Sequence, residues 1–266
     1  MTWQSLTSSS APARGSEGPI LSRGRKGAVV SGSLLISLLC LSSAAFGATI
    51  TGTVELTDSR DPAVAKKKDY SGVVVWLEGE SLPRASTAGA RKYTLAQRGK
   101  KFRPHVLTIP VGSVVDFPNF DPIFHNAFSN FAGQPFDVGL YAPGTTREVR
   151  FRRAGIVRVF CNIHSNMTAV IAVLDSPYFT QTNARGAWKI ENVPAGDYRL
   201  RFFHERASEA TLRALDRPIS IREGGLEVTP VRISESGYLE VPHKNKHGQD
   251  YPPVPREHIL YPGARE

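Results

Sequence analysis

Short runs rich in Val, Ile, Thr and Phe, separated by glycine and proline, make up most of this chain and constrain its fold more than any other feature. No long stretch shows the period of an amphipathic helix, whereas short apolar runs bounded by turn residues are typical of strands. The chain has 266 residues, with 23 Gly, 19 Pro and only two Cys. This length allows one large or two small domains, and so few cysteines exclude a disulfide-stapled mini-protein. We therefore predict an all-β fold.

The N-terminus has the pattern of a secretory signal. Three basic residues between positions 23 and 26 precede an apolar run at 28–41, which is shorter than the roughly 20 residues of a spanning helix. Ala45 and Gly47 supply the small residues of a cleavage site before Ala48. We predict that residues 1–47 are a signal peptide and that the mature protein is periplasmic or secreted, with no membrane span. A single membrane anchor is the alternative.

Charge argues against a nucleic-acid partner. Without residues 1–47 the chain keeps 29 basic and 23 acidic side chains, a net charge of +6. The charges are dispersed, and the one dense run, at 66–68, lies in a loop-like stretch. A dispersed pattern is typical of a solvated surface rather than a nucleic-acid groove. A basic face could instead steer an acidic partner toward the protein.

Signal cleavage changes the cysteine count in an informative way. Cys40 leaves with the signal and Met1 with the leader, so Cys161 and Met167 are the only such residues in the mature chain, and His164 lies between them. A lone cysteine is normally a small apolar core residue, and a lone methionine normally fills a gap in a core. Their confinement to one seven-residue segment around a histidine favours a metal site instead.

The sequence on both sides predicts how this segment lies. Residues 156–160 have strand character, and 168–174 form a long apolar run of the buried-strand type. A loop between two strands can turn a thiolate, an imidazole and a thioether toward one point, which a straight strand cannot do because its side chains alternate between faces. A fourth ligand is expected upstream, and His125, after the predicted strand 113–117, is the best candidate.

The ligand types indicate the metal. Two imidazoles, one thiolate and one weak thioether form the trigonal set that selects copper for electron transfer. Structural zinc sites use four strong ligands and usually paired cysteines, and the second cysteine is missing here. Because the thiolate must be deprotonated, metal binding is expected to release a proton.

The region 91–175 resembles the cupredoxin, or blue-copper, family. The matching order is a strand at 106–111, a turn at Gly112, a strand ending at Phe117, the pair His125-Asn126, and the loop Cys161–Met167. The loop spacing is similar to that of amicyanin, with plastocyanin-like flanks, and the whole is most similar to plastocyanin-like proteins associated with methylamine utilisation. The resemblance implies a Greek-key β-sandwich that holds one mononuclear type 1 copper.

Carried over residue by residue, the resemblance implies His125, Cys161 and His164 as equatorial ligands and Met167 as the axial ligand. The asparagine after the first histidine, here Asn126, is expected to hydrogen-bond across to the ligand loop and support the ligand geometry. Asn162 follows the cysteine, where a small hydroxyl residue is commoner. Four phenylalanines, Phe117, Phe120, Phe124 and Phe128, could line the site and lower the dielectric near the metal, but so dense a cluster is more often plain core packing.

A second small β-sandwich is predicted from the rest of the chain. Residues 182–200 suggest two strands joined by a Pro-Gly turn, similar to the carboxypeptidase regulatory-like and carbohydrate-binding-like modules. The expected earlier strands of such a module lie far upstream, near 51–54 and 72–77. We therefore assign 48–90 and 176–235 to this accessory sandwich, with the cupredoxin region inserted between its strands or packed continuously with it. A last strand is expected at 226–234, and 236–266 as an extended tail.

These inferences predict a one-electron carrier with no enzymatic activity, and the resemblance implies that it meets a transient redox partner through the edge of His164. One alternative is a copper storage or delivery factor. Another is a glycan- or protein-binding module with an accessory copper site, but its candidate aromatic residues, Trp76, Trp188 and Tyr198, have strand patterns that predict burial. Of the other histidines, those at 105 and 204 lie in strand-like runs, and those in the tail are expected to be solvent-exposed.

Overall fold

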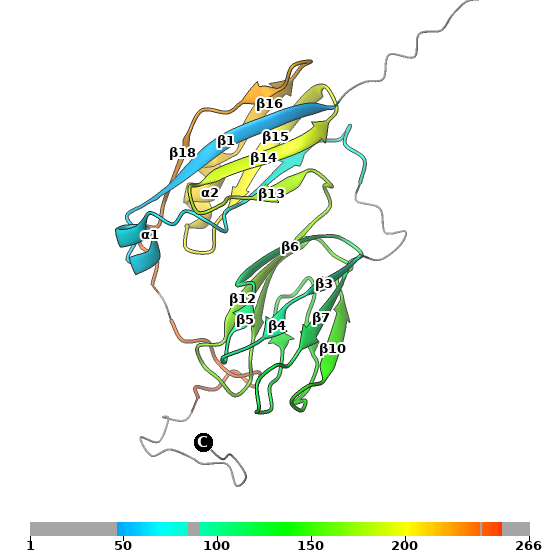
Figure 1. Cartoon of the computed structure of the whole chain (residues 1–266), viewed down its shortest axis with the longest axis vertical. Helices are drawn as coiled ribbons and strands as arrows, with labels where there is room; N and C mark the ends of the chain where they lie inside the picture. The colour runs from blue at the N-terminus through cyan, green and yellow to red at the C-terminus, as the bar shows by residue number, and fades with distance from the viewer. Residues whose placement is uncertain (1–46, 85–90, 240, 252–266) are drawn as a thin grey trace, which may run out of the picture. The chain divides into compact units, whose positions relative to one another are not determined.

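Strands dominate a computed structural model that describes residues 47–84, 91–239 and 241–251 (Figure 1). The all-β prediction is confirmed, with two short helices added to it. The predicted signal peptide, apart from Gly47, and the end of the predicted tail, 252–266, lie outside the described residues. No helix in the described ranges is long and apolar enough to cross a bilayer.

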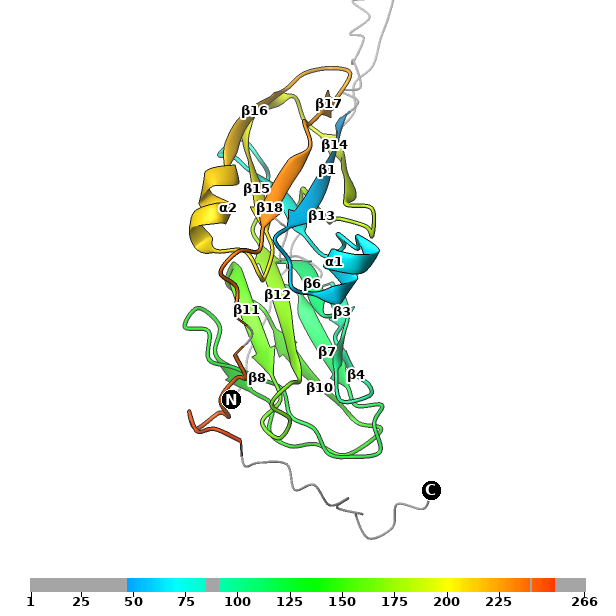
Figure 2. The same ribbon diagram turned by 90° about the vertical axis from the view of Figure 1, so that its left-hand side faces the viewer.

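One β-sandwich is formed by strands from both ends of the described chain. In its first sheet β1 lies between β14 on one side and β17 and β18 on the other, and its second sheet has the order β13-β2-β15-β16 (Figures 1 and 2). The elements are β1 (Ala48–Thr57), β2 (Val74–Glu78), β13 (Phe179–Gln181), β14 (Ala187–Val193), β15 (Gly196–Phe203), β16 (Arg217–Ile221), β17 (Leu226–Glu227) and β18 (Val231–Ser234).

Hydrogen-bonded pairing between strands that are far apart in the sequence holds this sandwich together. β1 pairs antiparallel with β14, and β2 pairs antiparallel with β15 and β13. Alternate residues of these strands point into one apolar core, which includes Ile50, Leu77 and Leu200. Trp188 and Tyr198 are also buried there, as predicted, whereas Trp76 is only partly buried. The strands of this sandwich therefore come from both sides of the region 91–175.

A second β-sandwich lies between β2 and β13 in the sequence. Its sheets have the orders β10-β7-β3 and β6-β12-β11-β8-β9, and a ribbon of β4 and β5 accompanies them. The elements are β3 (Lys92–Thr94), β4 (Ala96–Gln97), β5 (Phe102–Arg103), β6 (Val106–Pro110), β7 (Val114–Pro118), β8 (Phe128–Ser129), β9 (Phe136–Asp137), β10 (Thr146–Arg150), β11 (Gly155–Phe160) and β12 (Thr168–Leu174).

The antiparallel strands β11 and β12 flank the loop 161–167, which contains three of the predicted ligands. In β11 Val157 and Val159 point into the core while Arg158 is exposed, which is the alternation of a strand with one solvated face. β12 is buried along Ala169–Leu174 because both of its faces are covered. Ile171 joins the core of this sandwich, and Leu174 packs in a separate cluster with Val74 of β2. This explains why the run 168–174 is apolar throughout.

Two short helices and a divided last strand were not predicted from the sequence. α1 (Pro62–Lys67) is capped at its N-terminus by Asp61, whose side chain accepts a hydrogen bond from the Ala63 N–H. α2 (Glu209–Leu215) is capped by Ser208, whose hydroxyl accepts a hydrogen bond from the Thr211 N–H. Both helices are too short to produce a readable helical period. The last strand, predicted at 226–234, is divided into β17 and β18, because Pro230 between them cannot donate a ladder hydrogen bond.

A buried ion-pair network fixes the chain where it leaves β18. Glu235, almost fully buried, accepts hydrogen bonds from His204 Nε2 at 2.8 Å, Arg206 Nε at 2.8 Å and Ser59 Oγ at 2.5 Å. Burial alone would raise the pKa of Glu235, but these three donors outweigh it and lower the pKa to about 2. The carboxylate is therefore ionised and paired, and it anchors the start of the tail.

We expect Glu235→Gln to destabilise the protein by about 3 kcal/mol at pH 7. This is the free energy that corresponds to lowering the pKa of Glu235 from 4.5 to about 2 on folding. Because the pKa is lower in the folded state, this stabilisation is full above about pH 4.5 and is lost as the pH falls toward 2. Urea unfolding of the wild type and the variant at several pH values measures it. Glu227→Gln, at an exposed strand position, is the control. An equal loss of stability in both variants at pH 7 would contradict the assignment.

Candidate metal centre

The loop between β11 and β12, residues 161–167, is called the ligand loop here. It begins directly after the last residue pair of the two strands, Phe160 with Thr168. The Cys161 N–H donates to the Met167 carbonyl, and the Met167 N–H donates to the His164 carbonyl, each at 3.1 Å. These two backbone hydrogen bonds close the loop into a tight turn. The side chains of the loop therefore need not point alternately to opposite faces, as those of a strand do.

His125 lies between β7 and β8, and its backbone is fixed by an isolated bridge to Tyr141. The His125 N–H donates to the Tyr141 carbonyl at 3.2 Å, and the Tyr141 N–H donates to the His125 carbonyl at 2.9 Å. The buried Tyr141 hydroxyl in turn donates to the carbonyl of Phe117, at the end of β7, at 3.0 Å. His125 is therefore held against the sheet although it lies in no strand.

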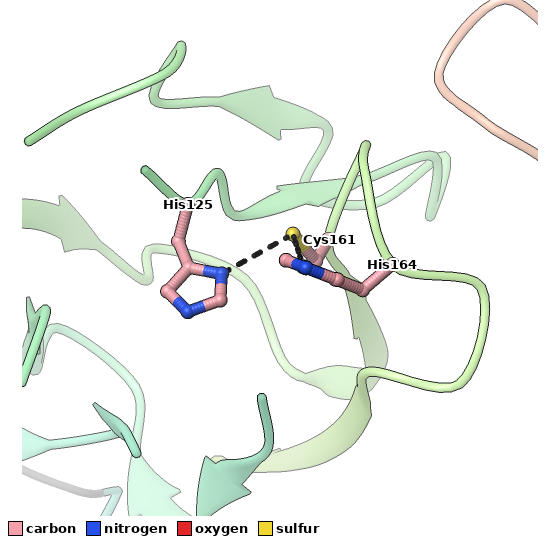
Figure 3. A group of neighbouring side chains, drawn as sticks. All are labelled: His125, Cys161 and His164. Carbon is pink, nitrogen blue, oxygen red and sulfur yellow. Dashed lines mark hydrogen bonds between the residues drawn. The ribbon is translucent and has the colours of Figure 1, made fainter. Parts of the chain in front are cut away.

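The structure brings His125, Cys161 and His164 together (Figure 3). Cys161 Sγ lies 3.9 Å from His125 Nδ1 and 3.6 Å from His164 Nδ1. Bonds of about 2.3 Å to sulfur and about 2.0 Å to nitrogen, in a trigonal arrangement, would separate these donors by about 3.7 Å. The two sulfur-to-nitrogen spacings therefore suit ligands of one first-row metal ion, and all three donor atoms lie within 4.8 Å of one another. No other group of three such residues is present in the described ranges.

Burial differs among the predicted ligands. His125, Cys161 and Met167 have no exposed surface, and Met167 packs in the same core cluster as Cys161. His164 is only partly buried. Among the four residues, His164 is therefore the only one that reaches the surface.

The electrostatic environment favours neutral groups when no cation is present. Burial raises the pKa of the Cys161 thiol, although backbone N–H groups of Ile163, Asn126 and His164 partly oppose this. Burial also lowers the pKa of His164 to about 4, and the nearby Lys100 lowers it further. A neutral imidazole has a free lone pair for a metal, and a bound cation would stabilise the thiolate that burial disfavours.

Asp121 sets the orientation of His125, and the sequence analysis missed it. Its Oδ2 lies 2.8 Å from His125 Nε2, and its carboxylate also accepts hydrogen bonds from the backbone N–H groups of Gly99 at 2.5 Å and Lys100 at 2.8 Å. Burial alone would raise the pKa of Asp121, but these donors together lower it. The ionised carboxylate favours a proton on Nε2, which leaves the Nδ1 lone pair directed toward Cys161.

The two asparagines expected to support the site have other partners. Asn126 Nδ2 donates to Asp137 Oδ1 at 2.7 Å, and its Oδ1 has no hydrogen-bond partner among the described residues, so its side chain does not bond to the ligand loop. The backbone N–H of Asn126, however, interacts with the Cys161 thiol and lowers its pKa. Asn162 Oδ1 accepts a hydrogen bond from the backbone of Lys246, at 2.9 Å.

The predicted aromatic lining is only half correct. Phe117 and Phe128 are buried, but Phe120 and Phe124 are 55% and 56% exposed. The stretch 119–127 contains no long strand, since its backbone is occupied by the hydrogen bonds of Asp121 and His125. Its two outer phenylalanines therefore lie on the surface instead of shielding the site.

The histidines outside the site match their predictions only in part. His105 and His204, predicted in strand-like runs, lie directly outside β6 and β15 and pair with Glu205 and Glu235 at 2.7 and 2.8 Å. His247 is exposed, and position 258 lies outside the described residues. His243, expected to be exposed, is partly buried, because its ring stacks on Phe160 with centroids 4.6 Å apart.

Comparison with solved structures finds cupredoxins and a copper enzyme. A purple cupredoxin from Nitrosopumilus maritimus is 23% identical, with 32% of this chain and 99% of its own covered and a TM-score of 0.28. A reduced amicyanin mutant is 17% identical, with 38% and 98% covered and a TM-score of 0.30. The copper-containing nitrite reductase of Thermus scotoductus is 23% identical, with 46% and 28% covered and a TM-score of 0.31. No protein-family model and no curated protein match the sequence. The description of the site therefore rests on its own geometry.

We expect Asp121→Asn to weaken Cu(II) binding about 10- to 100-fold, because an amide holds the His125 ring and its tautomer less firmly than a carboxylate does. Competition with a chelator of known affinity measures the change. Asp175→Asn, at an exposed position, is the control and should bind copper as the wild type does. Unchanged affinity in Asp121→Asn would show that this carboxylate does not support a metal ligand.

Proposed function

We propose that this protein is a periplasmic or secreted one-electron carrier that holds one copper ion between His125, Cys161 and His164, with Met167 as the axial ligand. The observation that carries the proposal is the convergence of one thiolate-forming and two imidazole side chains, with donor spacings of 3.6 and 3.9 Å. This donor set suits copper better than zinc, because it combines nitrogen for Cu(II) with soft sulfur for Cu(I).

The residues around the ion would favour electron transfer over catalysis. Copper would supply the change between its cupric and cuprous states. The two buried ligands, His125 and Cys161, are fixed by the bridge to Tyr141 and by the closed turn, which limits rearrangement between those states. With Met167 as the fourth ligand, no position stays open for a substrate, whereas catalytic metal sites keep one open.

The surface near the site suits a transient redox partner. Four apolar side chains that are 41–56% exposed directly precede Asp121, His125, Tyr141 and His164 in the sequence, and they are Phe120, Phe124, Leu140 and Ile163. The guanidinium of Arg98 lies 4.8 Å from the Phe120 ring, so positive charge borders this side chain. Exposed apolar side chains with a basic neighbour suit weak docking of an acidic partner near the partly buried His164.

The absorption spectrum of the purified protein with one equivalent of Cu(II) tests the proposal. We expect an intense visible sulfur-to-copper charge-transfer band that disappears on reduction and returns on oxidation. Cys161→Ser should lack the band, because it removes the only thiolate among the proposed ligands, and Ser165→Ala in the same loop should keep it. Copper bound without such a band, or a band that persists in Cys161→Ser, would contradict the proposal.

Met167→Leu tests the axial ligand separately. We expect the charge-transfer band to persist and the reduction potential to rise, because the cupric ion loses a donor while the cuprous ion tolerates lower coordination. Protein-film voltammetry measures the potential. Val170→Leu, an apolar change in the following strand, is the control for altered packing. A potential equal to that of the wild type would remove Met167 from the ligand set.

A storage or delivery role predicts different behaviour of the same site. In that case copper would exchange within seconds to an acceptor of moderate affinity, and oxidation and reduction would not cycle without loss of the metal. We propose the carrier role because three of the four ligands have no exposed surface, which hinders direct transfer of the ion to an acceptor.

A further inference from the structure

Residues 241–251 lie against the outer side of the ligand loop, and we call them the C-terminal clasp. The hydroxyl of Tyr251 donates a hydrogen bond to the Cys161 carbonyl at 2.6 Å. His243 Nε2 lies 3.2 Å from the His164 carbonyl oxygen, and the Lys246 N–H donates to Asn162 Oδ1 at 2.9 Å. Two of these three acceptors are the backbone carbonyls of predicted metal ligands.

The clasp is ordered by contacts of its own. Asn245 Oδ1 accepts hydrogen bonds from the N–H groups of His247 and Gln249, each at 2.9 Å, and the Asn245 N–H donates to the Gln249 carbonyl. These bonds form a tight turn in the middle of the clasp. The segment predicted as an extended tail therefore has a defined local structure over this part.

Aromatic packing fixes the clasp next to Cys161. The His243 ring stacks on Phe160, with an interplanar angle of 30°, and Phe160 directly precedes Cys161. The Tyr251 ring meets the His243 ring edge-on at a centroid distance of 5.2 Å. The hydroxyl of Tyr251 therefore reaches Cys161 from a supported position.

An ion pair joins the clasp to the other side of the site. Lys246 Nζ lies 2.8 Å from Asp137 Oδ2, and Asp137 Oδ1 accepts the hydrogen bond of Asn126 Nδ2 at 2.7 Å. Asn126 directly follows His125. The clasp thus contacts the ligand loop directly, and it contacts Asn126, next to His125, through Asp137. It therefore links the ligand loop to the part of the chain that carries His125.

We propose that the C-terminal clasp positions the ligand loop, with Tyr251 and His243 as its positioning residues, so that copper is retained and its reduction potential is set. The proposal rests on the proposed copper function. Water could donate hydrogen bonds to the Cys161 and His164 carbonyls in place of Tyr251 and His243, but it could not hold these carbonyls in fixed positions. What the clasp adds is therefore rigidity of the ligands, together with positive ends of N–H and O–H dipoles near the site, which favour the cuprous state.

Tyr251→Phe is the primary test, because it removes one hydroxyl and keeps the ring. We expect release of Cu(I) to a chromophoric chelator to become about tenfold faster, the lower end of the range for lost support around a metal ligand. The reduction potential should fall. His243→Ala should change both quantities in the same direction. Tyr178→Phe, in the other sandwich, is the matched control and should change neither.

A measurement without copper separates this proposal from the proposed function. In the apo-protein, Tyr251→Phe should speed hydrogen exchange of the Cys161 and Met167 amides, which close the ligand loop, by about fivefold. If copper fails to bind but exchange changes as expected, the copper function fails and the clasp stands as a positioning element. The clasp proposal would be overturned if Tyr251→Phe and His243→Ala both had the hydrogen exchange, copper release and reduction potential of the wild type. It would also be overturned if the variants lost stability with no change in reduction potential.

Discussion

Two backbone hydrogen bonds, from the Cys161 N–H to the Met167 carbonyl and from the Met167 N–H to the His164 carbonyl, are the constraint on which this site depends. They continue the pairing of β11 with β12 into a closed turn. A strand would send successive side chains to opposite faces, whereas this turn directs the Cys161 thiol and the His164 ring to one point. The rigid pair of strands behind the turn, buried on its inner face, gives that point a fixed place relative to His125.

Burial makes this arrangement a useful metal site. The sandwich encloses the thiol of Cys161 and the ring of His125, and burial disfavours charge on the thiol when no cation is present. The ionised Asp121 selects which nitrogen of His125 faces inward, and His164 is the only one of the four predicted ligands that is partly exposed. In the proposed carrier, His164 would therefore be the ligand through which an electron passes between the ion and a partner.

The sequence was sufficient to predict what depends on local pattern. The apolar run 168–174, the alternation of β11 and the confinement of Cys161 and Met167 to one loop all follow from residue order, and the structure agrees with the strands they predicted. The partners of the site were not predictable in this way. Asp121 could have been suspected from its place four residues before His125, but the contact of Tyr251 with Cys161 spans 90 residues and leaves no periodic signal. Phe120 and Phe124 were misplaced because an aromatic-rich stretch was read as core, although its backbone turns to hold Asp121 and His125.

The association with methylamine utilisation stays an expectation of the resemblance, since no residue of the site bears on an amine. The central claim is narrower: one ion is bound by one sulfur and two imidazoles. X-ray absorption at the copper edge, on the full protein loaded with one equivalent of copper, tests it most directly. The account predicts one short copper–sulfur distance and two imidazole nitrogens in both oxidation states, with little change between them. A copper shell of nitrogen and oxygen alone would contradict it.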